Sequence, residues 1–147
     1  MVNNLVTLIK GGVMKRFILA LVFTLFALSF KAVNVGDVVV SEKYSNGSVK
    51  KEYIVLSEGY KVTSYYENGS VSEIGYFDSN KKKTGEWISY FEEGKIKMKA
   101  SFKNDKKDGK WEVYDSVGKL IILIDYKNNK RKFICTVDQN GGLIART

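Results

Sequence analysis

The sequence predicts an all-β protein, an elongated single-sheet antiparallel β-meander of repeated hairpins, preceded by an N-terminal hydrophobic signal helix. Three observations predict this architecture. A glycine marks a turn at positions 47, 69, 94, 118 and 141, so a unit of about 24 residues repeats along the chain. The stretches beside these turns alternate apolar and polar residues, as a half-buried strand does. One short apolar run precedes them all.

The composition excludes several kinds of catalytic site. The chain has 147 residues, no His, one Cys and a formal charge of +8. Without His there is no Ser-His-Asp or Cys-His nucleophile and no His-ligated zinc, and one Cys allows no internal disulfide and no cysteine cluster. The acids near the turns lie beside solvent, where nothing separates their pKa values for acid–base work. We therefore expect no enzyme activity, no cofactor and no metal.

The first element is the apolar run Phe17–Phe30, which directly follows the basic pair Lys15-Arg16. Its 14 residues would span about 21 Å as a helix, short of a bilayer core of about 30 Å. A basic start and a short apolar run predict a signal peptide over residues 14–32. The mature chain would then be periplasmic, on the cell surface or secreted. The alternative is a membrane anchor by an uncleaved signal.

Residues 1–13 fit a signal peptide poorly, because a signal begins at its basic end. The codons for Lys10–Met14 can contain a bacterial ribosome-binding sequence, so we interpret residues 1–13 as an upstream extension and Met14 as the start. Residues 33–147 form the repeat domain, with a charge of +4. If this domain is exported, nucleic acid is not its partner.

The hairpin turns set the expected register. Asn46-Gly47, Asn68-Gly69 and Asn140-Gly141 suit two-residue turns in which both positions take φ > 0, and Glu93-Gly94 and Val117-Gly118 fill the equivalent places. A one-residue slip would reverse the faces of each strand. The pairs predicted on this basis are Val40–Tyr53, Tyr44–Val49, Tyr60–Phe77, Tyr66–Val71, Trp87–Ala100, Phe91–Ile96, Trp111–Ile124 and Val113–Ile122.

The shared apolar face of these pairs is the predicted core. Cys135 occupies the repeat position of Trp111, 24 residues later, so we expect it in the core as well. Ala100 and Met98 are expected to fill the space between the two tryptophans. The core residues are Trp87, Phe91, Met98, Phe102, Trp111, Ile122 and Ile124.

The opposite face carries tyrosines and aliphatic residues that a single sheet leaves uncovered. Over Leu120–Ile124 both faces are apolar, so the sheet either curls or is capped there, or meets a partner. An oligomer is one way to cover this end. The residues of this candidate protein-partner surface are Tyr65, Tyr76, Tyr90, Tyr114, Ile121 and Leu123.

The repeat resembles the MORN-repeat variant of bacterial proteins often labelled YwqK-like antitoxins. Its pattern G-x-W-x-x-Y-x-x-x-G-K is met by Gly85, Trp87, Tyr90, Gly94 and Lys95, and again by Gly109, Trp111, Tyr114, Gly118 and Lys119. The lysine-rich loop Lys103–Gly109 also matches, with Asp105 where Gly is commoner. The resemblance covers residues 60–131 well and the ends weakly. It implies a repeat scaffold that binds other molecules.

The loops between hairpins gather positive charge at one end of the strands. They are residues 78–85, 103–110 and 127–132, whereas the glycine turns at the other end carry acids. Such a basic rim suits anionic lipid or acidic polysaccharide, at about 1 kcal/mol per Lys near an anionic surface. The alternative is that these residues only keep the loops soluble. The candidate rim residues are Lys81, Lys82, Lys83, Lys106, Lys107, Lys130, Arg131 and Lys132.

The expected function is therefore that of a non-catalytic exported repeat scaffold, which binds a protein partner or an anionic envelope component. Tyr and Trp suit such a surface, since they bury large areas with few rotamers to freeze. The alternative is an antitoxin or immunity protein of a toxin–antitoxin-like pair, which the family label implies. An export signal argues against neutralising a cytoplasmic toxin.

Overall fold

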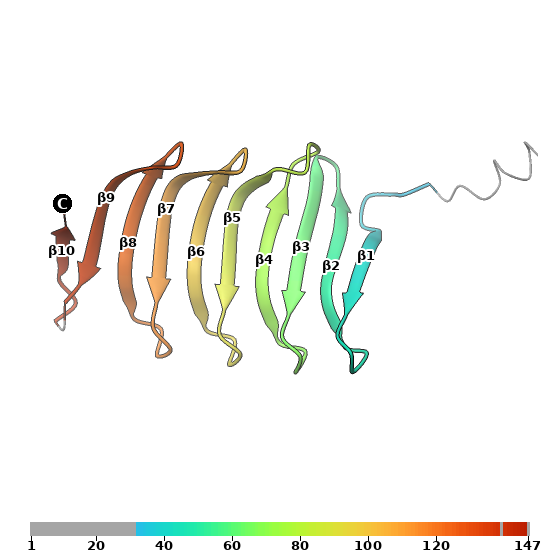
Figure 1. The fold of residues 1–147 in the computed structure, drawn as a ribbon, viewed down its shortest axis with the longest axis horizontal. Coiled ribbons are helices and arrows are strands. Elements are labelled where there is room, and N and C mark those ends of the chain that lie inside the picture. Colours follow the sequence, from blue (N-terminus) through green and yellow to red (C-terminus); the bar gives the residue numbers. More distant parts are fainter. Residues whose placement is uncertain (1–31, 139, 147) are drawn as a thin grey trace, which may run out of the picture. The chain divides into compact units, whose positions relative to one another are not determined.

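The computed structural model describes residues 32–138 and 140–146, and residues 34–147 form one compact unit. Ten strands build one antiparallel sheet, in which each strand pairs with its neighbours in sequence (Figure 1). The expected all-β meander of hairpins is thereby confirmed. The strands are β1 (Val38–Lys43), β2 (Val49–Leu56), β3 (Gly59–Tyr65), β4 (Val71–Phe77), β5 (Lys83–Tyr90), β6 (Ile96–Lys103), β7 (Lys106–Tyr114), β8 (Leu120–Lys127), β9 (Lys130–Val137) and β10 (Leu143–Arg146).

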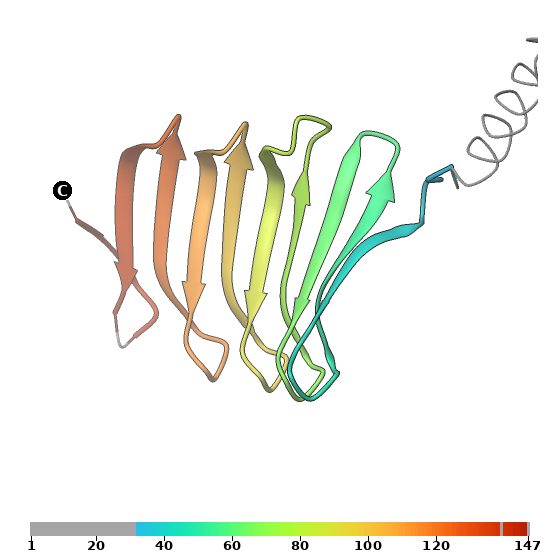
Figure 2. The ribbon, with the colours of Figure 1, turned by 45° about the vertical axis from the view of Figure 1, so that its right-hand side comes forward.

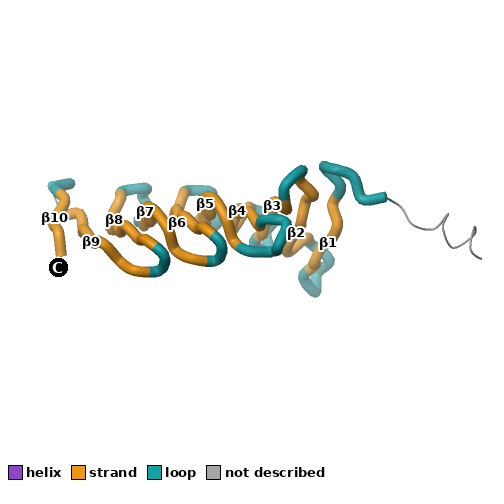
Figure 3. The backbone as a smooth tube through the Cα atoms, turned by 90° about the horizontal axis from the view of Figure 1, so that it is seen from above, coloured by secondary structure: helices purple, strands orange, loops and turns teal. Residues whose placement is uncertain are grey.

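The sheet is a single layer with loops along its two ends (Figures 2 and 3). The described residues contain neither a helix nor a second sheet that would cover either face. In the same part of the chain, no helix is long and apolar enough to cross a membrane. The expected upstream extension, residues 1–13, and the expected signal helix, residues 14–32, lie outside the described residues except for Ala32.

One face, here called the ring face, carries a chain of aromatic side chains that crosses the strands. Consecutive ring centroids are 5.1 to 6.3 Å apart, and four of the five pairs meet edge to face, which is a favoured arrangement. Trp87, one of these rings, forms the small buried core together with Val62 and Ala100. The rings belong to Tyr53, Phe77, Trp87, Phe102, Trp111 and Tyr126.

The other face, here called the tyrosine face, follows from strand pairing, because directly opposed residues point to the same side. One row of such pairs runs without interruption through all ten strands. Its members are Ser41, Glu52, Thr63, Ile74, Ile88, Lys99, Glu112, Leu123, Cys135 and Ala145.

The predicted register is right away from the turns and wrong beside them. The confirmed pairs are Val40–Tyr53, Tyr60–Phe77, Trp87–Ala100, Trp111–Ile124 and Val113–Ile122. Next to the turns the register shifts by one residue. Ile96 pairs with Tyr90 and not with the expected Phe91. In the same way, Val71 pairs with Tyr65 and Val49 pairs with Lys43.

The shift has its cause in the turn type. In the first turn, the N–H of Tyr44 donates to the C=O of Ser48 (2.9 Å), and Gly47 N–H donates to the C=O of Tyr44 (3.0 Å). Only the glycine has positive φ, 88° at Gly47. This is a three-residue loop that ends in a left-handed glycine, not the expected two-residue turn. Since only glycine needs φ > 0, Glu93 and Val117 fit the same turn without strain.

Two-residue turns with φ > 0 at both positions occur at the opposite end of the strands. Asn104 and Asp105 have φ of 51° and 64°, and Asn128 and Asn129 have φ of 49° and 66°. Asn and Asp tolerate the left-handed region better than other non-glycine residues, which is why this turn forms without glycine.

Cys135 lies on the tyrosine face, so the expectation that it takes the place of Trp111 in the core is wrong. Ile134 pairs with Ile124, as Trp111 pairs with Ala100. Lys107 and Trp111 of β7 are four positions apart in the sequence, whereas the equivalent Arg131 and Ile134 of β9 are three apart. The bulge of β9 is one residue shorter, so a count of 24 residues arrives on the wrong face.

Candidate binding surfaces

The six residues of the candidate partner surface all lie on the tyrosine face. Each is a member of the uninterrupted row of pairs or stands two positions from a member on the same strand, and therefore points to the same side. Tyr76 is 37% exposed, and the other five are half-buried. Tyr65, Tyr90 and Tyr114 close the equivalent strands β3, β5 and β7, and therefore lie about 10 Å apart, two strand spacings. The structure thus brings the predicted residues onto one surface.

Two of these tyrosines donate hydrogen bonds to carboxylates of the central row. Tyr65 donates its hydroxyl to Glu52 Oε2 (3.0 Å), and Tyr114 donates to Glu112 Oε2 (2.6 Å). Burial and the bond to Glu52 raise the pKa of Tyr65. The bond to Glu112, together with burial, raises the pKa of Tyr114 to about 12. Both phenols are therefore held protonated and oriented on the face.

Charged side chains accompany the tyrosines on this face. The ammonium of Lys99 lies 3.9 Å from a carboxylate oxygen of Glu112, and 6.0 Å from the centre of the Tyr114 ring. Ile88 and Leu123 are direct cross-strand neighbours of this pair. The tyrosine face therefore combines aromatic and aliphatic residues with a surface ion pair.

The basic rim differs from its expected form. Its loops are shorter than expected, because β5, β7 and β9 begin at Lys83, Lys106 and Lys130. Lys83 and Lys107 lie over the ring face, with ammonium groups 3.9 Å from the centre of the Trp87 ring and 4.5 Å from that of Trp111. The other six candidate rim residues are exposed: Lys81, Lys82, Lys106, Lys130, Arg131 and Lys132.

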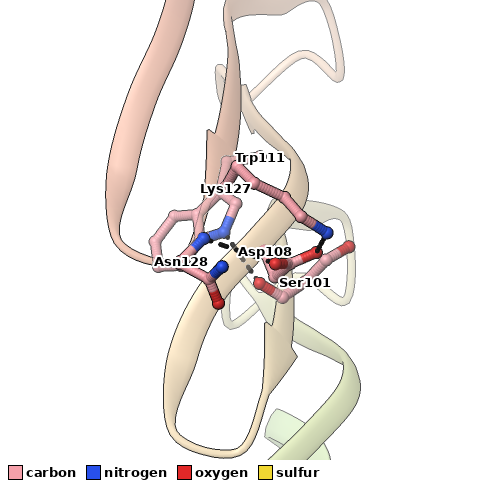
Figure 4. A network of polar contacts seen from close by, with 5 residues as sticks. All are labelled: Ser101, Asp108, Trp111, Lys127 and Asn128. Atoms are coloured by element: carbon pink, nitrogen blue, oxygen red, sulfur yellow. Dashed lines mark hydrogen bonds and ion pairs between the residues drawn. The ribbon is translucent and has the colours of Figure 1, made fainter.

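Asp108 organises the polar contacts behind the basic rim (Figure 4). Its Oδ1 forms an ion pair with Lys127 Nζ at 3.1 Å, and its Oδ2 accepts the N–H of Asn128 at 3.3 Å. The Lys127 hydrogen bond is the main reason that the pKa of Asp108 is lowered. Nearby, Trp111 Nε1 donates to the C=O of Ser101 at 3.0 Å. The exposed ammonium of Lys127 is thus paired with a carboxylate of the protein itself.

The glycine turns form an opposite rim, here called the turn rim. Its acids divide into two groups. Asp115 and Asp138 accept backbone N–H bonds within their own turns, for example from Lys119 (2.8 Å) and Gly142 (2.7 Å). The exposed acids are Glu67, Glu92 and Glu93.

The predicted core residues are placed unevenly. Trp87 is buried, and Met98, Phe102 and Trp111 pack against it and its neighbours. Phe91, Ile122 and Ile124 are half-buried and lie outside this cluster. Ala100 lies between the two tryptophans and pairs with both, and Met98 packs against the same cluster, as expected. The Phe102 ring also lies between them, 6.2 Å from Trp87 and 5.2 Å from Trp111.

Sequence reasoning placed Tyr53 and Phe77 on the apolar face through their predicted pairs, but it missed Val62. The signal that could have found Val62 is the pairing itself, which joins it to both Tyr53 and Gly75. Within the described residues, no group of three or more Cys, Asp or Glu side chains is arranged to hold a metal ion.

Three segments of the chain, residues 61–79, 83–104 and 107–128, match the family described as the MORN repeat variant. No curated protein and no solved structure matches the chain. The three segments correspond to β3–β4, β5–β6 and β7–β8, so each family repeat is one strand–glycine-turn–strand hairpin.

Proposed function

We propose that this chain, whose central hairpins are three MORN-variant repeats, is a non-catalytic scaffold that binds a protein partner through its tyrosine face. One observation carries the proposal: the ring face is used for the core, whereas the tyrosine face repeats Tyr65, Tyr90 and Tyr114 without a covering layer among the described residues. A surface that repeats every two strands suits an extended partner that meets several units at once.

The chemistry of the face supports a protein partner. Aromatic side chains dominate the energy of protein interfaces, and Tyr combines a large apolar ring with a hydroxyl that can bond. The hydroxyls of Tyr65 and Tyr114 are already fixed by Glu52 and Glu112, so less freedom is lost on binding. We also propose that the domain acts after export, since Lys15-Arg16 and the run Phe17–Phe30 have the form of a signal.

The experiment is affinity capture from the cells that produce the protein, with the full chain as bait. The variant Tyr90→Ala/Tyr114→Ala removes two rings of the tyrosine face. Its matched control is Glu92→Ala/Glu93→Ala, which removes two exposed acids of the turn rim. We expect the wild type and the control to capture the same protein and the tyrosine variant to lose it. Capture of that protein by a folded tyrosine variant would overturn the proposal.

A second candidate ligand is an anionic surface, because six cationic side chains on the basic rim are exposed. Several lysines at about 1 kcal/mol each would dock the rim reversibly. Vesicle pelleting at low salt separates this from the first proposal, because the Tyr90→Ala/Tyr114→Ala variant should still bind anionic vesicles. Equal pelleting with neutral and anionic vesicles would eliminate the lipid.

A further inference from the structure

A hollow of about 410 Å³ opens on the ring face at the β1 end of the sheet. Its wall is formed by side chains from the first four strands and by one cation from the loop between β4 and β5. A volume of this size lies within the range of small-ligand sites. The lining residues are Val39, Tyr53, Tyr60, Phe77 and Lys81.

In the later units an indole lies between the aromatic rings of neighbouring strands. The Trp87 ring lies between those of Phe77 (5.1 Å) and Phe102 (6.2 Å), and the ammonium of Lys83 covers it at 3.9 Å. The next unit repeats this arrangement, with Trp111 next to Phe102 at 5.2 Å. Each later gap is thus filled by an indole and covered by a lysine.

The first unit lacks both groups. Val62 stands three residues before Tyr65, as Trp87 stands three residues before Tyr90, so a valine replaces the tryptophan. The β2–β3 hairpin is also too short to carry the covering lysine.

Strand pairing shows which residue stands at the position of the covering lysine. Val55 pairs with Tyr60, whereas the equivalent Phe77 pairs with Lys83. The chain of rings therefore ends at Tyr53, 6.3 Å from Phe77, and the hollow opens beside these two rings.

We propose that this hollow binds a small aromatic carboxylate. The ring of the ligand would pack against Tyr53, Tyr60 and Phe77, which line the hollow. The carboxylate would meet Lys81, whose ammonium is exposed and forms no ion pair with any described carboxylate. This site lies on the ring face and is independent of the partner surface on the tyrosine face.

The test is isothermal titration calorimetry of the full chain with three probes. Cinnamate has both the ring and the charge, cinnamyl alcohol has the ring alone, and octanoate has the charge on an aliphatic tail. We expect one saturable site for cinnamate, roughly three- to fivefold weaker binding of the alcohol, as for the loss of one exposed ion pair, and no saturation with octanoate. Octanoate as tight as cinnamate, or no binding of cinnamate, would overturn the proposal.

Two matched substitutions locate the site. Lys81→Gln should weaken cinnamate roughly three- to fivefold and leave cinnamyl alcohol unchanged, whereas Lys82→Gln, one residue away and outside the hollow, should change neither. Val39→Trp fills the hollow from an exposed strand position and should abolish both. Equal effects of the two lysine variants, or full binding by a folded Val39→Trp protein, would contradict the assignment.

Discussion

Asp105 bonds to Lys83 with both its side chain and its backbone. Its Oδ1 accepts the N–H of Lys83 at 2.7 Å, and its own N–H donates to the C=O of Lys83 at 3.0 Å. Asn129 and Lys107 repeat the arrangement in the next unit, at 2.8 and 2.9 Å. The second residue of each two-residue turn thus fastens one hairpin to the preceding one, so neighbouring units are joined beyond the strand ladder.

The first prediction concerns this link. Asp105→Ala should lower the free energy of unfolding by about 2 kcal/mol, because it removes a charge-assisted hydrogen bond and places alanine at φ of 64°. Asp105→Asn should cost less than about half of that, since Asn129 already serves in the same place. Urea denaturation of both variants checks this; identical losses would mean that the side-chain acceptor contributes nothing.

The second prediction concerns Gly75, which lies under the indole of Trp87. A Cβ at this position would overlap the Trp87 ring carbons. Gly75→Ala should therefore destabilise the protein by about 3 kcal/mol through overpacking. In a Trp87→Leu background the same change should cost less than about 1 kcal/mol, because the clash is gone. A full cost in both backgrounds, measured by thermal unfolding, would assign the effect to the backbone instead.

The sequence was sufficient to predict the sheet, its order and the pairs in mid-strand. Alternation and regularly spaced glycines determine which side of a strand is apolar, and any slip would turn residues such as Trp111 to the other face. The same reasoning could not predict the type of the glycine turns. Asn46-Gly47 suits both a two-residue turn and a three-residue loop, and the difference lies in whether Asn or only Gly takes positive φ.

The sequence also predicted part of the tyrosine face and part of the basic rim. Tyr90 and Tyr114 were placed on their face by alternation alone. Cys135 was not, because one residue fewer in the β9 bulge reverses the face, and the sequence shows this only as a spacing of 23 residues from Gly118 to Gly141 in place of 24 from Gly94 to Gly118. Lys83 and Lys107 were assigned to a solvent rim by their charge, although long lysine stems also cover aromatic rings.

The third prediction separates folding from binding. Trp111→Ala should cost about 3 kcal/mol or more, because its ring touches Phe102 and Tyr126 and its Nε1 bonds to Ser101. Tyr90→Ala/Tyr114→Ala should lower the melting temperature far less, since these rings lie on the tyrosine face, away from the buried core and the chain of rings. Differential scanning calorimetry compares them, and an equal drop would contradict the division between the two faces.

The fourth prediction follows from the pKa of Tyr114. Its hydrogen bond to Glu112 (2.6 Å) raises that pKa from 10.0 to about 12, so the folded chain keeps a proton that the unfolded chain releases. The stability from this pair should be complete below pH 10.0 and should be lost as the pH rises to about 12. Glu112→Gln should lower the pKa of Tyr114 and flatten this loss.

Absorbance titration of phenolate measures the pKa values of the tyrosines. The difference between the wild type and Tyr114→Phe identifies the titration of Tyr114. We expect this substitution to remove a phenol that titrates near the raised value, and to leave the raised pKa of Tyr65 in place, because Tyr65 bonds to Glu52 on another strand. If the phenol that disappears titrates at the ordinary value of 10.0, the bond to Glu112 does not persist in solution, and the tyrosine face is less ordered than the structure has it.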